Sequence, residues 1–180
     1  MARPISYRWT GRGDRVLQRP ILIASLLILG GVVALAQPLQ IRVSQSNQPV
    51  EFSAGETDLI AGAGSDIVDW FYSAVNEKTL DIRNPDNNWR VDISRSDTTW
   101  HTGLRIEVLR TGDGTGSGTL TGGDDDYTEI TTSATPLFYG TNGDARTVPL
   151  QFRLRGQFGY YVVPAGTYPT TIIYTVYDDI

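Results

Sequence analysis

The sequence predicts an all-β protein, an immunoglobulin-like antiparallel β-sandwich preceded by an N-terminal signal segment. Three observations lead to this fold class. Apolar and polar residues alternate in several short runs, turn-forming residues separate those runs, and helical periodicity is almost absent. Strands with one buried and one solvated face show this alternation, and many such strands at about ten-residue spacing are typical of a sandwich.

The alternation is clearest in four runs, "LQIRVSQ", "NNWRVDIS", "LRIEVLR" and "VPLQFRLRG". Successive side chains of a strand point to opposite faces, so every second residue of each run is expected in the core. The residues expected there are Leu39, Ile41, Val43, Trp89, Val91, Ile93, Leu104, Ile106, Val108, Val148, Leu150, Phe152 and Leu154.

Turn chemistry lies between the runs, in "RNPDNN", "TGDGTGSG", "TGGDDD", "GTNGD" and "PAG". One stretch, "GSDIVDWFYSAVNEKTL", leaves two alternatives open. Asp66 is a candidate helix cap before apolar residues at near-helical spacing, whereas "IVDWFY" has strong β-propensity. We favour a strand followed by a turn.

Residues 1–36 differ in composition from the rest of the chain. Five arginines precede the uncharged run "ILIASLLILGGVVALA", which ends in an A-x-A pattern. These features predict an export signal cleaved before Gln37 or, as the alternative, an uncleaved anchor. The run is short for a membrane span, which needs about 20 apolar residues. We therefore expect an extracytoplasmic protein, in the periplasm, on the cell surface or secreted, that meets the membrane only through this segment during export.

The remaining 144 residues are expected to form an N-terminal strand, residues 37–48, and one β-sandwich domain, residues 49–180. They carry ten Lys and Arg against nineteen Asp and Glu, a net charge of −9. Nucleic acid is not an expected partner, because binding a phosphate backbone requires clustered cations. The chain has no cysteine, so disulfides and thiolate chemistry are excluded.

No catalytic pattern is apparent, and we do not expect an enzyme. His101 is the single histidine, and no nucleophile-elbow sequence accompanies it, so a hydrogen-bonded histidine at a strand end is expected. Carboxylates are plentiful, but they lie in turn-like sequence rather than in the apolar frame that a general acid needs.

The loop "TGDGTGSGTLTGGDDDYTE" is the candidate metal site, with Asp113, Asp124, Asp125 and Asp126 as oxygen ligands. Calcium prefers such ligands, although the EF-hand spacing is absent. The alternative is a solvated hairpin tip. No firm metal site and no cofactor are expected.

Aromatic residues suggest a second class of function. Trp70, Trp89 and Trp100, with Tyr160 and Tyr161, are candidates for a sugar-stacking platform. Core packing is the competing interpretation, because Trp89 shares an alternating face with Val91 and Ile93.

The last strand raises a question of assembly. In "TTIIYTVY" both faces are largely apolar, as expected for a strand inside a sheet, yet little sequence follows it to supply another neighbour. An unpaired apolar edge is a template for another chain. The N-terminal strand is a candidate donor, through Leu39, Ile41 and Val43, and the acceptor strand is expected to be lined by Ile172, Tyr174 and Val176. The alternative is a self-contained monomer in which residues 39–45 pair within the chain's own sheet.

The segment "VPAGTYPTTIIYTVY", together with "ARTVPLQFRLRG" upstream, resembles the closing strands of the spore coat protein U and Csu-type fimbrial subunit group. The resemblance covers about residues 145–177. It implies a secreted immunoglobulin-like sandwich, assembled on the cell surface by a chaperone and usher, in which the N-terminal strand of one subunit completes the next. This sequence lacks the cysteine pair that is common in pilus subunits.

These observations predict a non-enzymatic structural or adhesive surface protein, a candidate fibre subunit assembled by β-strand donation. Its partners would be further copies or other surface subunits. The alternative is a monomeric extracytoplasmic module that binds carbohydrate or calcium.

Overall fold

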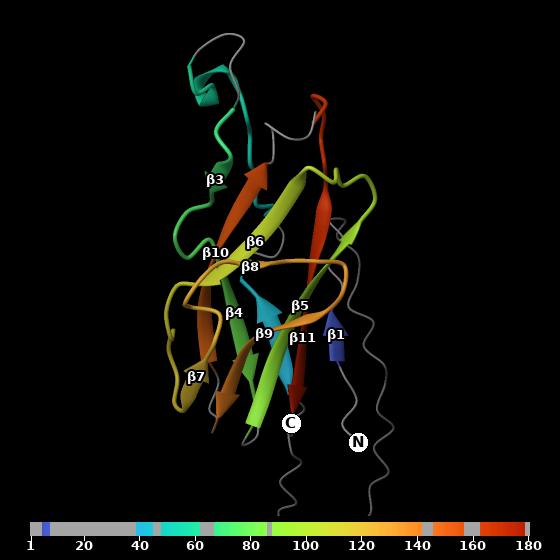
Figure 1. The fold of residues 1–180 in the computed structure, drawn as a ribbon. Coiled ribbons are helices and arrows are strands. Elements are labelled where there is room, and N and C mark those ends of the chain that lie inside the picture. The colour runs from blue at the N-terminus through green and yellow to red at the C-terminus, as the bar shows by residue number, and fades with distance from the viewer. Residues whose placement is uncertain are drawn as a thin grey trace, which may run out of the picture.

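The computed structural model describes residues 5–7, 39–44, 48–61, 67–85, 88–141, 146–156 and 163–178. Within these ranges the chain is all-β, and its one helical element is the 3-10 turn η1 (Glu56–Asp58). All strand pairings described are antiparallel (Figure 1). The predicted all-β antiparallel class is thus confirmed, whereas the predicted signal segment lies almost entirely outside the described residues.

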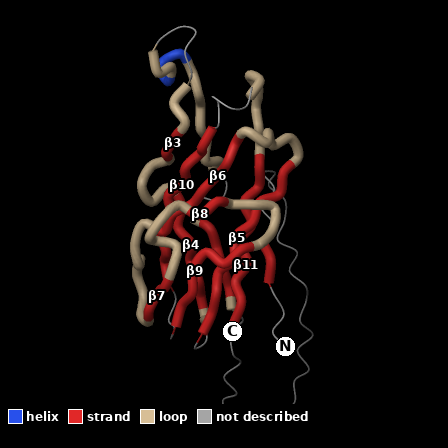
Figure 2. The backbone as a smooth tube through the Cα atoms, in the orientation of Figure 1, coloured by secondary structure: helices blue, strands red, loops and turns tan. Residues whose placement is uncertain are grey.

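The described strands form two sheets. In spatial order, the β11 sheet contains β1 (Ile5–Tyr7), β11 (Thr170–Asp178), β5 (Asn88–Asp97), β9 (Thr135–Thr141) and β7 (Thr119–Thr121). The β10 sheet contains β2 (Gln40–Val43), β4 (Lys78–Arg83), β10 (Arg146–Gly156), β6 (Leu104–Arg110) and β8 (Thr128–Glu129), while β3 (Trp70–Tyr72) also pairs with β10. Figure 2 shows how little of the described chain is helical.

The strand order does not confirm the immunoglobulin-like topology. In an immunoglobulin constant domain the last two strands are neighbours in one sheet. Here β10 and β11 lie in different sheets, and every connection from β4 to β11 leads from one sheet to the other. Connections that alternate between two sheets are found in double-sheet jelly rolls.

One hydrophobic core lies between the two sheets and takes side chains from both. Trp89, Val91 and Ile93 come from β5, and Val148 and Leu150 come from β10, all as the alternation predicts. Leu154 departs from the pattern and is only partly buried.

The ambiguous stretch before β4 forms a strand followed by a turn. Trp70–Tyr72 is β3, and Asn76 takes a left-handed backbone conformation (φ 61°) just before β4 begins at Lys78. Asp66, the candidate helix cap, lies outside the described residues. The segment around η1 extends beyond one end of the two sheets (Figure 1).

Candidate functional site

The two sides of β11 are paired very differently. One side pairs with β5 along the whole strand, from Thr170 opposite Asp97 to Asp178 opposite Trp89. The other side, called here the outer edge of β11, pairs with β1, where Ile5 lies opposite Val176. Among the described residues, no strand lies beside positions 170–173 on that side. In the described chain, therefore, only part of the outer edge, positions 174–176, is paired with an antiparallel strand.

Residues 5–7 lie within the segment that the sequence predicts to be removed on export. If that segment is cleaved, β11 loses the one neighbour described on its outer edge. A strand edge without a partner presents a row of N–H and C=O groups that can pair with another chain.

The side chains predicted to line the acceptor strand point into the core. Val176 is fully buried, Tyr174 is nearly so, and Ile172 packs against the same cluster. Burial raises the pKa of the Tyr174 phenol above its ordinary value, because the charged form loses its hydration. What the outer edge offers a neighbour is therefore main chain rather than these side chains.

The candidate donor strand lies within the chain's own fold. Strand β2 pairs with β4, with Ile41 opposite Ile82 and Val43 opposite Leu80. Leu39 and Ile41 are buried in the core, and Val43 packs against it. This is the self-contained arrangement weighed from the sequence. Since β2 and β11 contact each other, candidate donor and acceptor residues contribute to one core.

The Asp-rich loop converges on an arginine. The guanidinium of Arg110, whose side chain is 1% exposed, lies 2.6 Å from an Asp113 carboxylate oxygen and 2.7 Å from one of Asp124. It also donates a hydrogen bond to the Gly122 carbonyl at 2.9 Å. Two of the four candidate calcium ligands thus already face a fixed positive charge.

The other two candidate ligands, Asp125 and Asp126, are exposed. Within the described ranges, no group of three or more His, Cys, Asp or Glu side chains is placed to hold a metal ion. Arg110 was not among the site residues predicted from the sequence, although the sequence contains a signal for it. In "LRIEVLR" it continues the inward face of Leu104, Ile106 and Val108, so period-two counting buries it.

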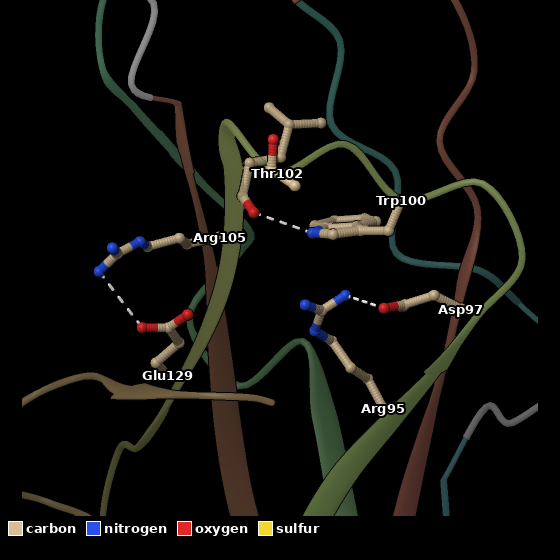
Figure 3. A pocket seen from close by; sticks show the side chains of 7 residues that line it. Arg95, Asp97, Trp100, Thr102, Arg105 and Glu129 are labelled. Carbon is tan, nitrogen blue, oxygen red and sulfur yellow. Dashed lines mark hydrogen bonds and ion pairs between the residues drawn. The ribbon is translucent and has the colours of Figure 1, made fainter. Parts of the chain in front are cut away.

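A polar hollow of about 350 Å³ opens where β5 ends and β6 begins (Figure 3). Two ion pairs flank it, Arg95 with Asp97 and Arg105 with Glu129. The residues that line it are Arg95, Asp97, Trp100, Thr102, Leu104, Arg105 and Glu129.

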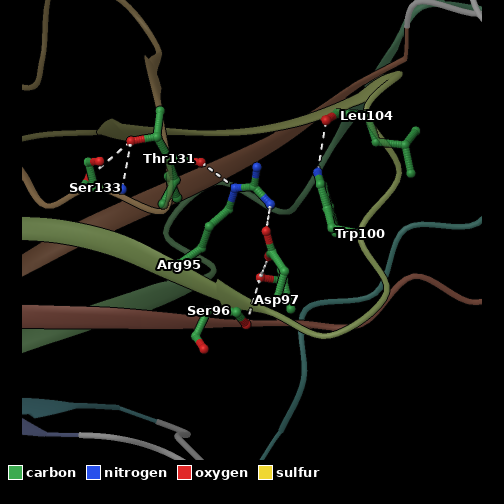
Figure 4. Close-up of polar contacts among 9 residues, drawn as sticks. Arg95, Ser96, Asp97, Trp100, Leu104, Thr131 and Ser133 are labelled. Atoms are coloured by element: carbon green, nitrogen blue, oxygen red, sulfur yellow. Dashed lines mark hydrogen bonds and ion pairs between the residues drawn. The ribbon is translucent and has the colours of Figure 1, made fainter.

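Hydrogen bonds fix the wall of this hollow (Figure 4). The Trp100 indole N–H donates to the Leu104 carbonyl at 2.8 Å, and the Arg95 guanidinium lies 5.1 Å from the Trp100 ring centroid. Arg95 also donates to the Ile130 carbonyl at 2.8 Å. Each carboxylate of the hollow faces a guanidinium, so neither has the apolar surroundings of a general acid.

The aromatic residues predicted to form a sugar-stacking platform do not lie together. Trp89 is in the core, Trp100 lines the hollow, and Trp70 is exposed on β3, while Tyr160 and Tyr161 lie outside the described residues.

His101 lies just before β6 and accepts a hydrogen bond from the Gly103 backbone N–H at Nδ1, at 3.0 Å, as predicted for a strand-end histidine.

Searches against protein-family models, curated proteins and solved structures gave no match to this chain. The resemblance to the spore coat protein U and Csu-type group therefore rests on the residues quoted above. In the described part of the chain, no helix has the length and apolar character needed to cross a membrane.

Proposed function

We propose that this chain is a non-enzymatic, secreted structural protein of the cell surface that self-associates through the outer edge of β11. One observation carries the proposal. The strand described on that edge, residues 5–7, belongs to the segment predicted to be cleaved on export. Export would then produce the assembling form, because it would free the edge only outside the cytoplasm.

The edge has the properties that favour strand addition. Positions 170–177 contain neither Lys nor Pro, the residues that natural edges use against pairing. The pairing with β1 demonstrates a register, Ile5 opposite Val176 and Tyr7 opposite Tyr174, in which the edge takes an antiparallel strand. Main-chain hydrogen bonds supply the affinity in such strand addition.

A second copy can supply the incoming strand in two ways. The β11 edge of another copy would give a closed dimer, because the two surfaces are identical. The N-terminal strand of another copy would give a fibre, as in the subunits that the sequence resembles. This second route requires β2 to leave β4 and to withdraw Leu39 and Ile41 from their own core. The two routes give assemblies of different size.

A peptide spanning residues 3–9, "RPISYRW", tests whether the outer edge is the acceptor. Added in excess to residues 37–180, it should occupy β11 and reduce the assembled fraction measured by sedimentation velocity. A scrambled peptide of the same composition is the control. The proposal fails if residues 37–180 stay monomeric at every concentration, or if both peptides act equally.

A further inference from the structure

Rings and guanidinium groups meet on the face of the β10 sheet turned away from the core. Trp70 and Tyr72 lie on β3, opposite Arg155 and Arg153 of β10. The guanidinium carbon of Arg153 is 4.2 Å from the Trp70 ring centroid and 4.0 Å from that of Tyr127, and Arg155 is 4.5 Å from Trp70. These five residues are called here the arginine–aromatic platform.

Hydrogen bonds and a ring contact fix the side chains of the platform in position. Arg153 donates a hydrogen bond from Nε to the buried carboxylate of Glu107 at 2.6 Å. The Tyr127 hydroxyl donates to Gln151 Oε1 at 2.8 Å, and its ring meets the Tyr72 ring edge-on at 5.9 Å. Burial raises the pKa of Tyr127, so its hydroxyl remains a donor at neutral pH. The rings are therefore positioned before any ligand arrives.

Two of these rings face solvent. Trp70 is 37% exposed and Tyr72 is 55% exposed. They stand two residues apart on one strand, so they point to the same side of the sheet. Five of the six large exposed apolar side chains among the described residues fall within positions 60–75, the segment that contains β3.

The platform carries a cation that the described residues do not neutralise. Arg153 is paired with Glu107, whereas Arg155 forms no ion pair with a described residue. The exported chain has a net charge of −9, so the positive group beside the exposed rings is opposite in sign to the net charge of the chain. This combination suits a ligand with flat apolar faces and negative charge.

We propose that the arginine–aromatic platform binds an acidic polysaccharide, a polymer of sugar rings that carry carboxylates. The apolar C–H face of a sugar ring would stack on Tyr72, the more exposed ring. A sugar carboxylate would pair with Arg155, which the Trp70 ring holds in place through their contact at 4.5 Å. Single-stranded nucleic acid also offers rings and anions, but binding a phosphate backbone requires clustered cations, and Arg155 is the one platform guanidinium without an ion pair to a described residue. Strand addition at β11 uses a different surface, so this binding does not depend on it.

Affinity electrophoresis tests this proposal on protein purified from cells that express the full-length sequence. Migration is compared in gels that contain polygalacturonate, a neutral glucan or no polymer. Polygalacturonate should retard the protein, and the neutral glucan should retard it much less. Salt at about 1 M should weaken the retardation, because it shortens the screening length to about 3 Å.

Single substitutions identify the surface. Trp70→Ala and Tyr72→Ala should each weaken binding about threefold to tenfold. Arg155→Gln should reduce retardation by polygalacturonate to that by the neutral glucan. Tyr139→Ala is the matched control, because Tyr139 is an exposed aromatic of β9, in the other sheet. Thermal midpoints confirm that each variant is folded.

Two groups of results would overturn the proposal. The first is an unretarded wild type, or equal retardation by the acidic and neutral polymers. The second is a Tyr139→Ala variant that loses as much binding as Trp70→Ala.

Discussion

Replacing Ile41 by aspartate tests where the N-terminal strand belongs. Ile41 is 4% exposed and lies opposite Ile82 of β4, which is fully buried. A carboxylate at this position would lose its hydration, which is costly inside a core. The variant is therefore expected to be folded but much less stable than the wild type.

The loss in the free energy of unfolding is limited to the stability that the packing of β2 contributes. Because β2 is a short edge strand, it can leave β4 and return the new carboxylate to water. The cost is then the burial of Leu39 and Ile41, at about 1.5–3 kcal/mol for each side chain, or about 3–6 kcal/mol together. This is a large fraction of the 5–15 kcal/mol typical of a whole domain.

Urea unfolding followed by the fluorescence of the tryptophans measures the loss, with Trp89 as the buried reporter. Gln40→Asp is the matched control, because it adds the same charge one residue away on the partly exposed side of β2. If both variants unfold at the same urea concentration, β2 does not belong to the monomer's sheet. If Ile41→Asp instead stays fully stable and loses only self-association, the strand is donated to a neighbour.

Three further changes probe the fold. A Cβ at Gly140 would meet Trp89 Cζ2 at 2.0 Å, so Gly140→Ala should lower the thermal midpoint through a loss of about 1–3 kcal/mol or more. Arg110→Met should cost about 1–3 kcal/mol in urea unfolding by leaving the partly buried Gly122 carbonyl without its donor. Millimolar calcium should leave the wild-type thermal midpoint unchanged, and an upward shift would contradict the role given to Arg110. The pKa of Tyr174 is higher in the folded than in the unfolded state, so the stability that its neutral form supports is present below about pH 10 and falls as the pH rises further. Urea midpoints from pH 8 to 11 should show this fall, and Tyr174→Phe should reduce it; an equal fall in both proteins would be the contrary result.

Local features of the fold were predictable because strand alternation is a local property. Trp89, Val91 and Ile93 fall on one face by counting in twos, and burial between two sheets follows from that count. The order of the strands was not predictable in this way. Alternation identifies which residues are buried, but it does not specify which edges pair, and the last two strands proved to lie in different sheets.

For the candidate sites as well, residue types were predictable from the sequence, whereas the contacts between distant segments were not. The tryptophans could be grouped from the sequence only by residue type, whereas the structure separates the buried Trp89 from the exposed Trp70. The partners of Trp70, Arg153 and Arg155, are about 80 residues away in the sequence and reach it only through the β3–β10 pairing. The pairing of residues 5–7 with β11 spans nearly the whole chain, and the composition around those residues indicates a signal segment rather than a strand.

The proposed assembly requires the outer edge of β11 to accept a strand from another copy. Light scattering after size-exclusion chromatography, over a range of concentrations, compares residues 37–180 with the same chain carrying Thr171→Lys and Ile173→Lys. Both substitutions lie on β11 between the inward-facing residues, and lysine on an edge opposes pairing. We expect the mass of the unsubstituted protein to rise with concentration, whereas the variant should keep the monomer mass. If both proteins stay monomeric at every concentration, or if both assemble equally, the outer edge of β11 is not the surface of assembly.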